Sequence, residues 1–251
     1  MRLFCVPYAG SGAAAYRGWA ESAGDLDVCY VQPPGRENRL GEAPFTSMDE
    51  LVKALADGVE PLLDRPYALY GHSLGGIVAF ELARALRSRG RAEPTHLFVS
   101  ASRAPQLPNP YEPIRHLADL PMLEEIHRRY DSVPIQVMQD PERRELVVPG
   151  LRADITMLET YRHSAAKPLA CGITCFGATE DRAVTRDAIG EWSIHTQSKF
   201  ELQMFEGGHL FLQNARSRLL SAVRAALHPD SQPVGQAFLA RDHGDYGAGA
   251  N

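Results

Sequence analysis

Short apolar segments of β type alternate with segments of helical periodicity along most of the chain. Apolar strands of this kind are typical of a parallel sheet that is covered on both faces, because neither side of such a strand meets water. The expected strands are 3–6, 28–31, 67–70, 96–100, 173–176 and 200–205, and the expected helices are 13–22, 47–63, 74–89, 186–195 and 215–227. The alternation predicts an α/β fold with a mostly parallel sheet and helices on both of its faces.

Residues 103–164 interrupt this alternation. A proline-rich stretch at 105–113 leads into segments of helical pattern at 122–130, 141–148 and 151–161. Long insertions in compact domains often serve as lids over a binding pocket, so we expect a helical lid here and not a passive excursion of the scaffold. The expected organisation is one domain over residues 1–227 that contains this lid. A tail at 228–251 lacks periodicity and is predicted to be disordered.

The composition argues against several classes of function. With 26 basic and 31 acidic residues the chain has a formal net charge of −5 and no run of Lys or Arg, so it lacks the positive field that nucleic-acid binding needs. No apolar stretch is long enough to span a bilayer, and the apolar start of the chain turns polar too soon for a signal peptide. We therefore expect no nucleic-acid partner, no membrane association and a cytoplasmic localisation.

Neither a metal nor another cofactor is expected from the Cys and His residues. The four cysteines fall in apolar stretches and form no C-x-x-C pair, which favours buried reduced thiols: Cys5, Cys29, Cys171 and Cys175. The nine histidines are scattered and include no H-E-x-x-H or similar pair of ligands. The chemistry is expected to rest on the side chains and backbone of the protein.

The strongest candidate for a catalytic residue is Ser73, in the run Gly71-His72-Ser73-Leu74-Gly75. A G-x-S-x-G match arises by chance in chains rich in Gly and Ser, so its surroundings must decide. Here an expected strand ends directly before it and an amphipathic helix begins directly after it, which is the arrangement of a nucleophile elbow. The two glycines permit the sharp reversal that exposes the serine hydroxyl. The sequence therefore predicts Ser73 as a nucleophile.

A serine hydroxyl needs a base, and the base needs an orienting acid. If their order along the chain is nucleophile, acid and base, His209 fits as the base, because it follows the last expected strand directly. The acid belongs on the loop after the preceding strand, where Glu180 and Asp181 are adjacent. We choose Asp181 and keep Glu180 as its rival, because spacing alone does not separate them.

A tetrahedral intermediate also needs two N–H donors for its oxyanion. The N–H of Leu74 follows from its place after the nucleophile, and the N–H of Ala9, in the loop 7–12 after the first strand, is the expected second donor. The segment 10–15 also matches the dinucleotide fingerprint G-x-G-x-x-A. We reject that alternative because Gln32 stands where the ribose-binding acid is expected, and because three residues separate the strand from the glycines.

With these residues placed, the chain resembles the type II (editing) thioesterases of polyketide synthase and nonribosomal peptide synthetase pathways, which have the α/β-hydrolase fold. The resemblance extends from residue 3 to about 227. It is carried by LFCVPYAG at 3–10, YRGW at 16–19, VQPPGRENRL at 31–40, GHSLG at 71–75, AFELA at 79–83, SRAP at 102–105, LRAD at 151–154 and GGHLF at 207–211. The run PPGRENRL is the most specific of these, because general lipases do not contain it.

The resemblance implies an enzyme that hydrolyses acyl thioesters on the phosphopantetheine arm of acyl or peptidyl carrier proteins and removes stalled or misprimed acyl groups. It implies a triad of Ser73, Asp181 and His209, an oxyanion hole formed by Ala9 and Leu74, and a mobile lid that shapes the acyl chamber. We also expect a monomer. The alternatives are a product-releasing or cyclising thioesterase or acyltransferase, a general carboxylesterase, and a catalytically silent protein that docks carriers.

Three features depart from the family's usual pattern. Leu74 stands where the family usually has Met, and Arg182 stands where it often has Pro. Relatives usually also have a leading strand before the first strand expected here, and Met1 almost adjoins that strand.

Overall fold

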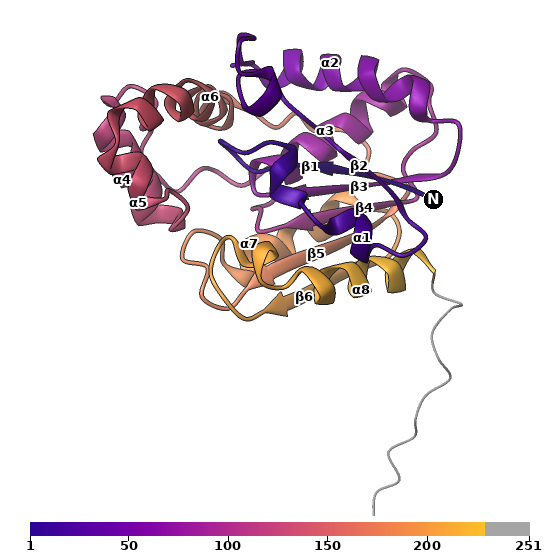
Figure 1. Ribbon diagram of the computed structural model, residues 1–251. Coiled ribbons are helices and arrows are strands. Elements are labelled where there is room, and N and C mark those ends of the chain that lie inside the picture. Colours follow the sequence, from indigo (N-terminus) through magenta and orange to yellow (C-terminus); the bar gives the residue numbers. More distant parts are fainter. Residues whose placement is uncertain (229–251) are drawn as a thin grey trace, which may run out of the picture.

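The computed structural model describes residues 1–228 and contains one six-stranded sheet in which every pairing of neighbouring strands is parallel. The strand order is β2-β1-β3-β4-β5-β6 (Figure 1). The strands are β1 (Arg2–Val6), β2 (Asp27–Tyr30), β3 (Tyr67–His72), β4 (His96–Ser100), β5 (Gly172–Ala178) and β6 (Phe200–Phe205). All six expected strands are therefore confirmed. The predicted disorder at 229–251 lies outside the described residues.

The most apolar strands occupy the middle of the sheet. Every residue of β3 and β5 is buried, whereas the edge strands β2 and β6 are mostly half-buried. Phe4, Leu69 and Leu97 lie side by side on β1, β3 and β4. Strands without a polar face are stable only when both faces of the sheet are covered.

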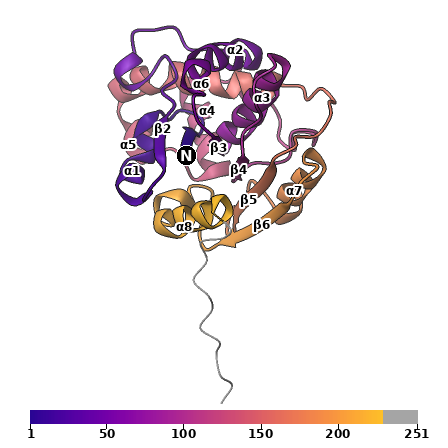
Figure 2. The same cartoon turned by 90° about the vertical axis from the view of Figure 1, so that its right-hand side faces the viewer.

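Helices cover both faces of the sheet, as the alternation predicted (Figures 1 and 2). Each face has its own apolar core. One face carries α2 (Met48–Val59), α3 (Leu74–Ser88) and α7 (Arg186–Gly190), and the other carries α1 (Trp19–Ser22) and α8 (Arg216–Leu227).

Three of the expected helices are shorter than predicted. In the segment 47–63, α2 ends at Val59 and a 3₁₀ turn, Glu60–Leu62, follows. The segment 13–22 is broken into a 3₁₀ turn, Ala13–Tyr16, and the four-residue α1, because Gly18 between them has a φ of +80°. The segment 186–195 begins as α7 and continues as a 3₁₀ turn, Glu191–His195.

The insertion forms three helices: α4 (Asp119–Tyr130), α5 (Ile135–Gln139) and α6 (Pro141–Thr160). We call these helices the lid; they lie beyond the carboxyl ends of the strands and have a small apolar core of their own (Figure 1). The sequence predicted two helices at 141–148 and 151–161 and none at 135–139. Instead, α6 runs through Pro149, and its first turn is capped by Asp140, which accepts from the N–H groups of Glu142 and Arg143.

Candidate active site

Ser73 lies between the last residue of β3 and the first residue of α3, with a φ of +54° and a ψ of −120°. This backbone conformation is strained for a residue with a side chain. The chain around it is too close for larger residues: a Cβ on Gly71 would lie 2.0 Å from the carbonyl oxygen of Gly75, and one on Gly75 would lie 2.2 Å from that of Val6. The structure thus places Ser73 in the strand–turn–helix setting that the motif predicted.

Three predicted side chains form one hydrogen-bonded chain. The Ser73 hydroxyl lies 2.9 Å from Nε2 of His209, and Nδ1 of His209 lies 2.8 Å from Oδ2 of Asp181. The other oxygen of Asp181 accepts from the N–H groups of Ala183 and Val184, at 2.9 and 3.1 Å. The side chains of His209 and Asp181 are buried, with exposed fractions of 4% and 0%.

Of the two candidate acids, the structure brings Asp181 and not Glu180 to the histidine. Glu180 is exposed on the same loop. This chain of contacts is the arrangement in which an imidazole removes the proton of a serine hydroxyl while a carboxylate holds its tautomer.

The loop Pro7–Gly12, which we call the oxyanion loop, contains a tight turn. The carbonyl of Tyr8 accepts from the N–H of Ser11 at 3.1 Å, and Gly10 has a φ of +75°. The close approach of Gly75 to the carbonyls of Val6 and Pro7 places this loop against the start of α3. Ala9 and Ser73 line the same cavity, so the two expected N–H donors, on Ala9 and Leu74, belong to segments that meet at the serine.

The same loop is unsuited to a dinucleotide. Three N–H groups in and just after this loop are already bonded within the protein: that of Gly10 to Asp154, that of Ala13 to Gln32 and that of Ala14 to Glu37. The segment after it is a 3₁₀ turn of four residues and not the long helix of a dinucleotide-binding site.

Two cavities meet at Ser73. They share Ser73, Tyr130, Leu158 and His209. The larger cavity, of about 780 Å³, has several polar lining residues: Arg103, Asn109, Glu112, Arg162 and His163. The smaller cavity, of about 290 Å³, is lined on its lid side by apolar residues: Ile126, Val133, Val137, Val147, Leu151 and Ile155.

Residues 1–227 match the thioesterase domain family. The chain belongs to this family. The gramicidin S biosynthesis protein GrsT of Aneurinibacillus migulanus is 37% identical to this thioesterase over 221 residues, which is 88% of this chain and 86% of GrsT. The family that the sequence motifs predicted is therefore confirmed.

Solved structures of thioesterases superpose closely. RedJ, a thioesterase from the prodiginine pathway of Streptomyces coelicolor, has a TM-score of 0.82 at 38% identity and covers 88% of this chain and 84% of its own. The type II thioesterase BorB from the borrelidin cluster has a TM-score of 0.82 at 35% identity, covering 90% of this chain and 92% of its own. These relatives confirm the α/β-hydrolase fold.

His72, which the sequence analysis left without a role, supports the catalytic histidine candidate of this thioesterase. Its Nε2–H donates to the backbone carbonyl of His209 at 2.9 Å, and its Nδ1 accepts from the hydroxyl of Ser100 at 2.9 Å. Burial lowers the pKa of His72 well below its ordinary value of 6.5, which keeps the ring neutral. A neutral ring has one donor and one acceptor, as this arrangement requires. The position of His72 directly before the serine was the only signal in the sequence.

Tyr130, at the end of α4, packs on His209 of the hydrogen-bonded chain from the lid side. Its ring lies 5.0 Å from that of His209, and burial raises the pKa of its phenol to about 12. Because Tyr130 lines both cavities, it lies where the two cavities meet. No sequence pattern sets Tyr130 apart from the other aromatic residues of the insertion.

The remaining predictions concern metals, thiols and membranes. Within residues 1–228, no three His, Cys, Asp or Glu side chains are placed to hold a metal ion, and no helix there is long and apolar enough to cross a membrane. All four cysteines are unpaired. Cys5, Cys171 and Cys175 are buried as predicted, whereas Cys29 on the edge strand β2 is only half-buried.

Proposed function

We propose that this thioesterase uses Ser73 to hydrolyse acyl thioesters on the phosphopantetheine arm of acyl or peptidyl carrier proteins, and that it removes stalled or misprimed acyl groups in polyketide or nonribosomal peptide biosynthesis. The observation that carries the proposal is the hydrogen-bonded chain from Ser73 through His209 to Asp181 at the junction of two cavities. The pathways named for GrsT, RedJ and BorB support the choice of substrate. One copy of the chain supplies all the proposed site residues, which supports action as a monomer.

In the first half of the reaction, Oγ of Ser73 attacks the thioester carbonyl as Nε2 of His209 takes its proton. Asp181 stabilises the resulting imidazolium, and the N–H groups of Ala9 and Leu74 bind the oxyanion. The C–S bond then breaks, His209 returns the proton to the leaving sulfur, and the acyl group stays on Ser73 as an ester.

In the second half, His209 takes a proton from a water molecule, which attacks the ester carbonyl. A second oxyanion forms in the same place. It collapses to the free carboxylic acid, and His209 returns the proton to Ser73. The carrier thiol and the acid are the two products.

The two cavities suit the two parts of the substrate. The smaller cavity has an apolar lid side, so it favours an aliphatic acyl chain, which gains free energy when it leaves water. The larger cavity offers hydrogen-bonding side chains such as Asn109 and Arg162, which suit the amide groups of a pantetheine arm. We therefore infer that the acyl chain lies under the lid and that the arm approaches through the larger cavity.

The test is a panel of acyl groups loaded on a holo carrier protein, with products identified by mass spectrometry. We expect linear carboxylic acids from the wild-type protein, and turnover lower by about three orders of magnitude or more in Ser73→Ala, with unchanged folding. A cyclic or transferred product would favour a cyclase or acyltransferase. Faster turnover of a free p-nitrophenyl ester than of every carrier thioester would favour a general carboxylesterase. Full activity of Ser73→Ala would refute the nucleophile.

A further inference from the structure

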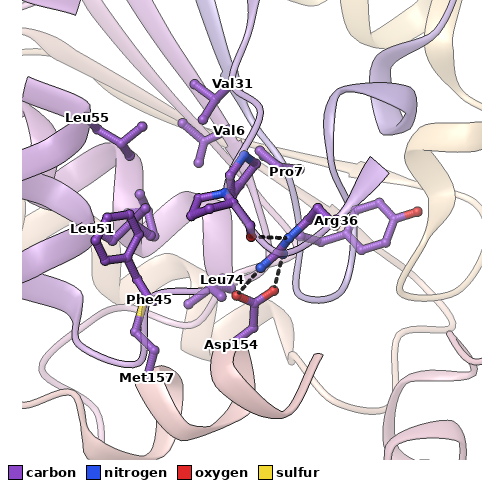
Figure 3. A pocket seen from close by; sticks show the side chains of 14 residues that line it. Val6, Pro7, Val31, Arg36, Phe45, Leu51, Leu55, Leu74, Asp154 and Met157 are labelled. Atoms are coloured by element: carbon purple, nitrogen blue, oxygen red, sulfur yellow. Dashed lines mark hydrogen bonds and ion pairs between the residues drawn. The ribbon is translucent and has the colours of Figure 1, made fainter. Parts of the chain in front are cut away.

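A buried ion pair joins the lid to the loop after β2. Arg36 and Asp154 are 8% and 4% exposed, and they form a bidentate pair with distances of 2.5 Å from Nη1 to Oδ2 and 3.0 Å from Nη2 to Oδ1. Figure 3 shows the two side chains facing each other beside Leu74. Arg36 belongs to the run PPGRENRL and Asp154 to LRAD, two of the motifs that the catalytic chemistry leaves unexplained.

Both partners of this pair also bond to the oxyanion loop. Oδ2 of Asp154 accepts from the N–H of Gly10 at 2.7 Å, and Nη1 of Arg36 donates to the carbonyl of Ser11 at 3.2 Å. The pair therefore holds the peptide group between Ala9 and Gly10 and the peptide group between Ser11 and Gly12. Burial raises the pKa of Asp154, and the neighbouring Arg36 opposes this effect. Arg36 therefore helps to keep Asp154 ionised, in the form that accepts the hydrogen bond from the Gly10 N–H.

The lid helix α6 packs tightly on the same place. A Cβ on Gly150 would lie 3.0 Å from the carbonyl oxygen of Gly35, and one on Gly10 would lie 3.0 Å from Cδ1 of Leu151. Asp154 is thus held in position by the packing of its own helix against both loops. The packing of α6 on the two loops therefore fixes the position of the Asp154 carboxylate relative to the oxyanion loop.

Stability alone gives a weak reason for such a pair. Two charges lose much of their hydration when they are buried, and an apolar pair of similar volume is often as stable or more so. The two residues are 118 positions apart in the chain, and each of them bonds to the backbone of the oxyanion loop. The pair therefore restricts the conformation of that loop.

We propose that Arg36 and Asp154 are positioning residues that fix the direction of the Ala9 N–H for the oxyanion; this rests on the proposed function in that Ala9 is taken as a donor. Each peptide group is planar and trans, so its C=O and N–H point in opposite directions. The turn fixes the Tyr8 carbonyl through the Ser11 N–H, and this also fixes the Ala9 N–H. Asp154 holds the next peptide group, at Gly10, and so keeps the turn from rotating.

The test replaces the pair by apolar residues, Arg36→Met with Asp154→Leu, which leaves no buried charge unpaired. We expect kcat for a p-nitrophenyl acyl ester to fall by about 10- to 100-fold with KM within about twofold, because the oxyanion contact exists only in the tetrahedral state. The inhibition constant of an alkyl trifluoromethyl ketone, which forms a tetrahedral adduct on a catalytic serine, should rise by the same factor as kcat falls. If the pair has a purely structural role, the double substitution lowers the melting temperature but leaves kcat and the inhibition constant of the folded protein unchanged.

The matched control is Glu125→Gln, which disrupts another ion pair of the lid, with Arg129, that does not contact the oxyanion loop. It should keep kcat and the inhibition constant within about twofold of the wild type. A double variant that folds and behaves like this control would overturn the proposal.

If the double variant does not fold, the single variant Arg36→Lys tests the same positioning role. It keeps a cation beside Asp154 but loses the bond to Ser11, so we expect kcat lower by about three- to tenfold at unchanged KM. Unchanged kcat in this variant would also overturn the proposal. Use of the ester separates the positioning role of the pair from the proposed function. A wild-type protein that is active on the ester and inactive on every carrier thioester would contradict the proposed function, but the role of the pair could still be tested on the ester.

Discussion

The carboxylate of Asp181 has hydrogen-bond partners on both oxygens, whereas its neighbour Glu180 is exposed to solvent. His209 is held at both ring nitrogens, and its backbone carbonyl is held by His72. Such contacts set the orientation and tautomer of the imidazole before substrate binds, so little reorganisation remains for the reaction itself.

The two adjacent acids allow a matched test at the residue scale. Asp181→Asn should lower kcat by about 10⁴-fold, because an amide at this place favours the wrong tautomer of His209. Glu180→Gln should keep kcat within about twofold, since the exposed side chain does not reach the histidine. Steady-state kinetics on one acyl-carrier substrate decides between them. A large loss in Glu180→Gln with activity retained in Asp181→Asn would reverse the assignment.

At the scale of the element, the turn from β3 into α3 depends on the absence of a side chain at Gly75. Its Cβ would overlap the carbonyl oxygen of Val6 at 2.2 Å, and backbone does not give way as a flexible side chain does. We predict that Gly75→Ala lowers the free energy of unfolding by about 2–3 kcal/mol. The measurement is urea denaturation followed by circular dichroism.

Gly58 provides the control for this substitution. It is exposed in the last turn of α2, and a Cβ there would meet no atom within 4 Å. Gly58→Ala should raise the free energy of unfolding by about 0.5–1 kcal/mol, because alanine loses less backbone entropy in a helix. Equal effects of the two variants would show that the turn tolerates a side chain.

The lid helix α6 allows a test of where the acyl chain binds. Val147 lines the smaller cavity, and its neighbour Leu146 is 55% exposed. Val147→Phe should reduce kcat/KM for a hexanoyl carrier by about tenfold or more relative to an acetyl carrier, because the new ring takes space that the longer chain needs. Leu146→Phe should leave this ratio unchanged. If neither variant changes the ratio, the acyl chain does not bind under the lid.

At the scale of the whole molecule, three neutral histidines are embedded in the structure: His72, His96 and His195. Burial lowers the pKa of each, for His96 and His195 to about 4, from an ordinary value of 6.5. Below pH 6.5 the unfolded chain binds protons at these sites and the folded protein does not. The free energy of unfolding therefore falls as the pH decreases from 6.5 toward 4.

His96→Gln tests this dependence. Glutamine keeps a hydrogen-bonding partner for Thr174 but takes up no proton. We expect the loss of unfolding free energy between pH 7 and pH 5 to be smaller than in the wild type by about 1–2 kcal/mol, measured by urea denaturation at both pH values. An unchanged pH dependence in His96→Gln would show that His96 takes up protons equally in both states.

The sequence alone was sufficient for the parallel sheet, the place of Ser73 between a strand and a helix, and the order of serine, acid and histidine along the chain. These features follow from local patterns: runs of apolar residues, helical periodicity, and glycines at a turn. The resemblance to the thioesterase family was also visible in the sequence, because the most specific motif, at 33–40, is a continuous stretch.

Only the tertiary structure decided between Asp181 and Glu180, joined 141–148 and 151–161 into one helix through Pro149, and gave His72 a partner. It alone brought Arg36 and Asp154 together at the oxyanion loop. The physical reason is the same in each case. Which of two neighbouring side chains makes a buried contact, and whether a proline is tolerated in a helix, depends on packing between segments that lie far apart in the chain.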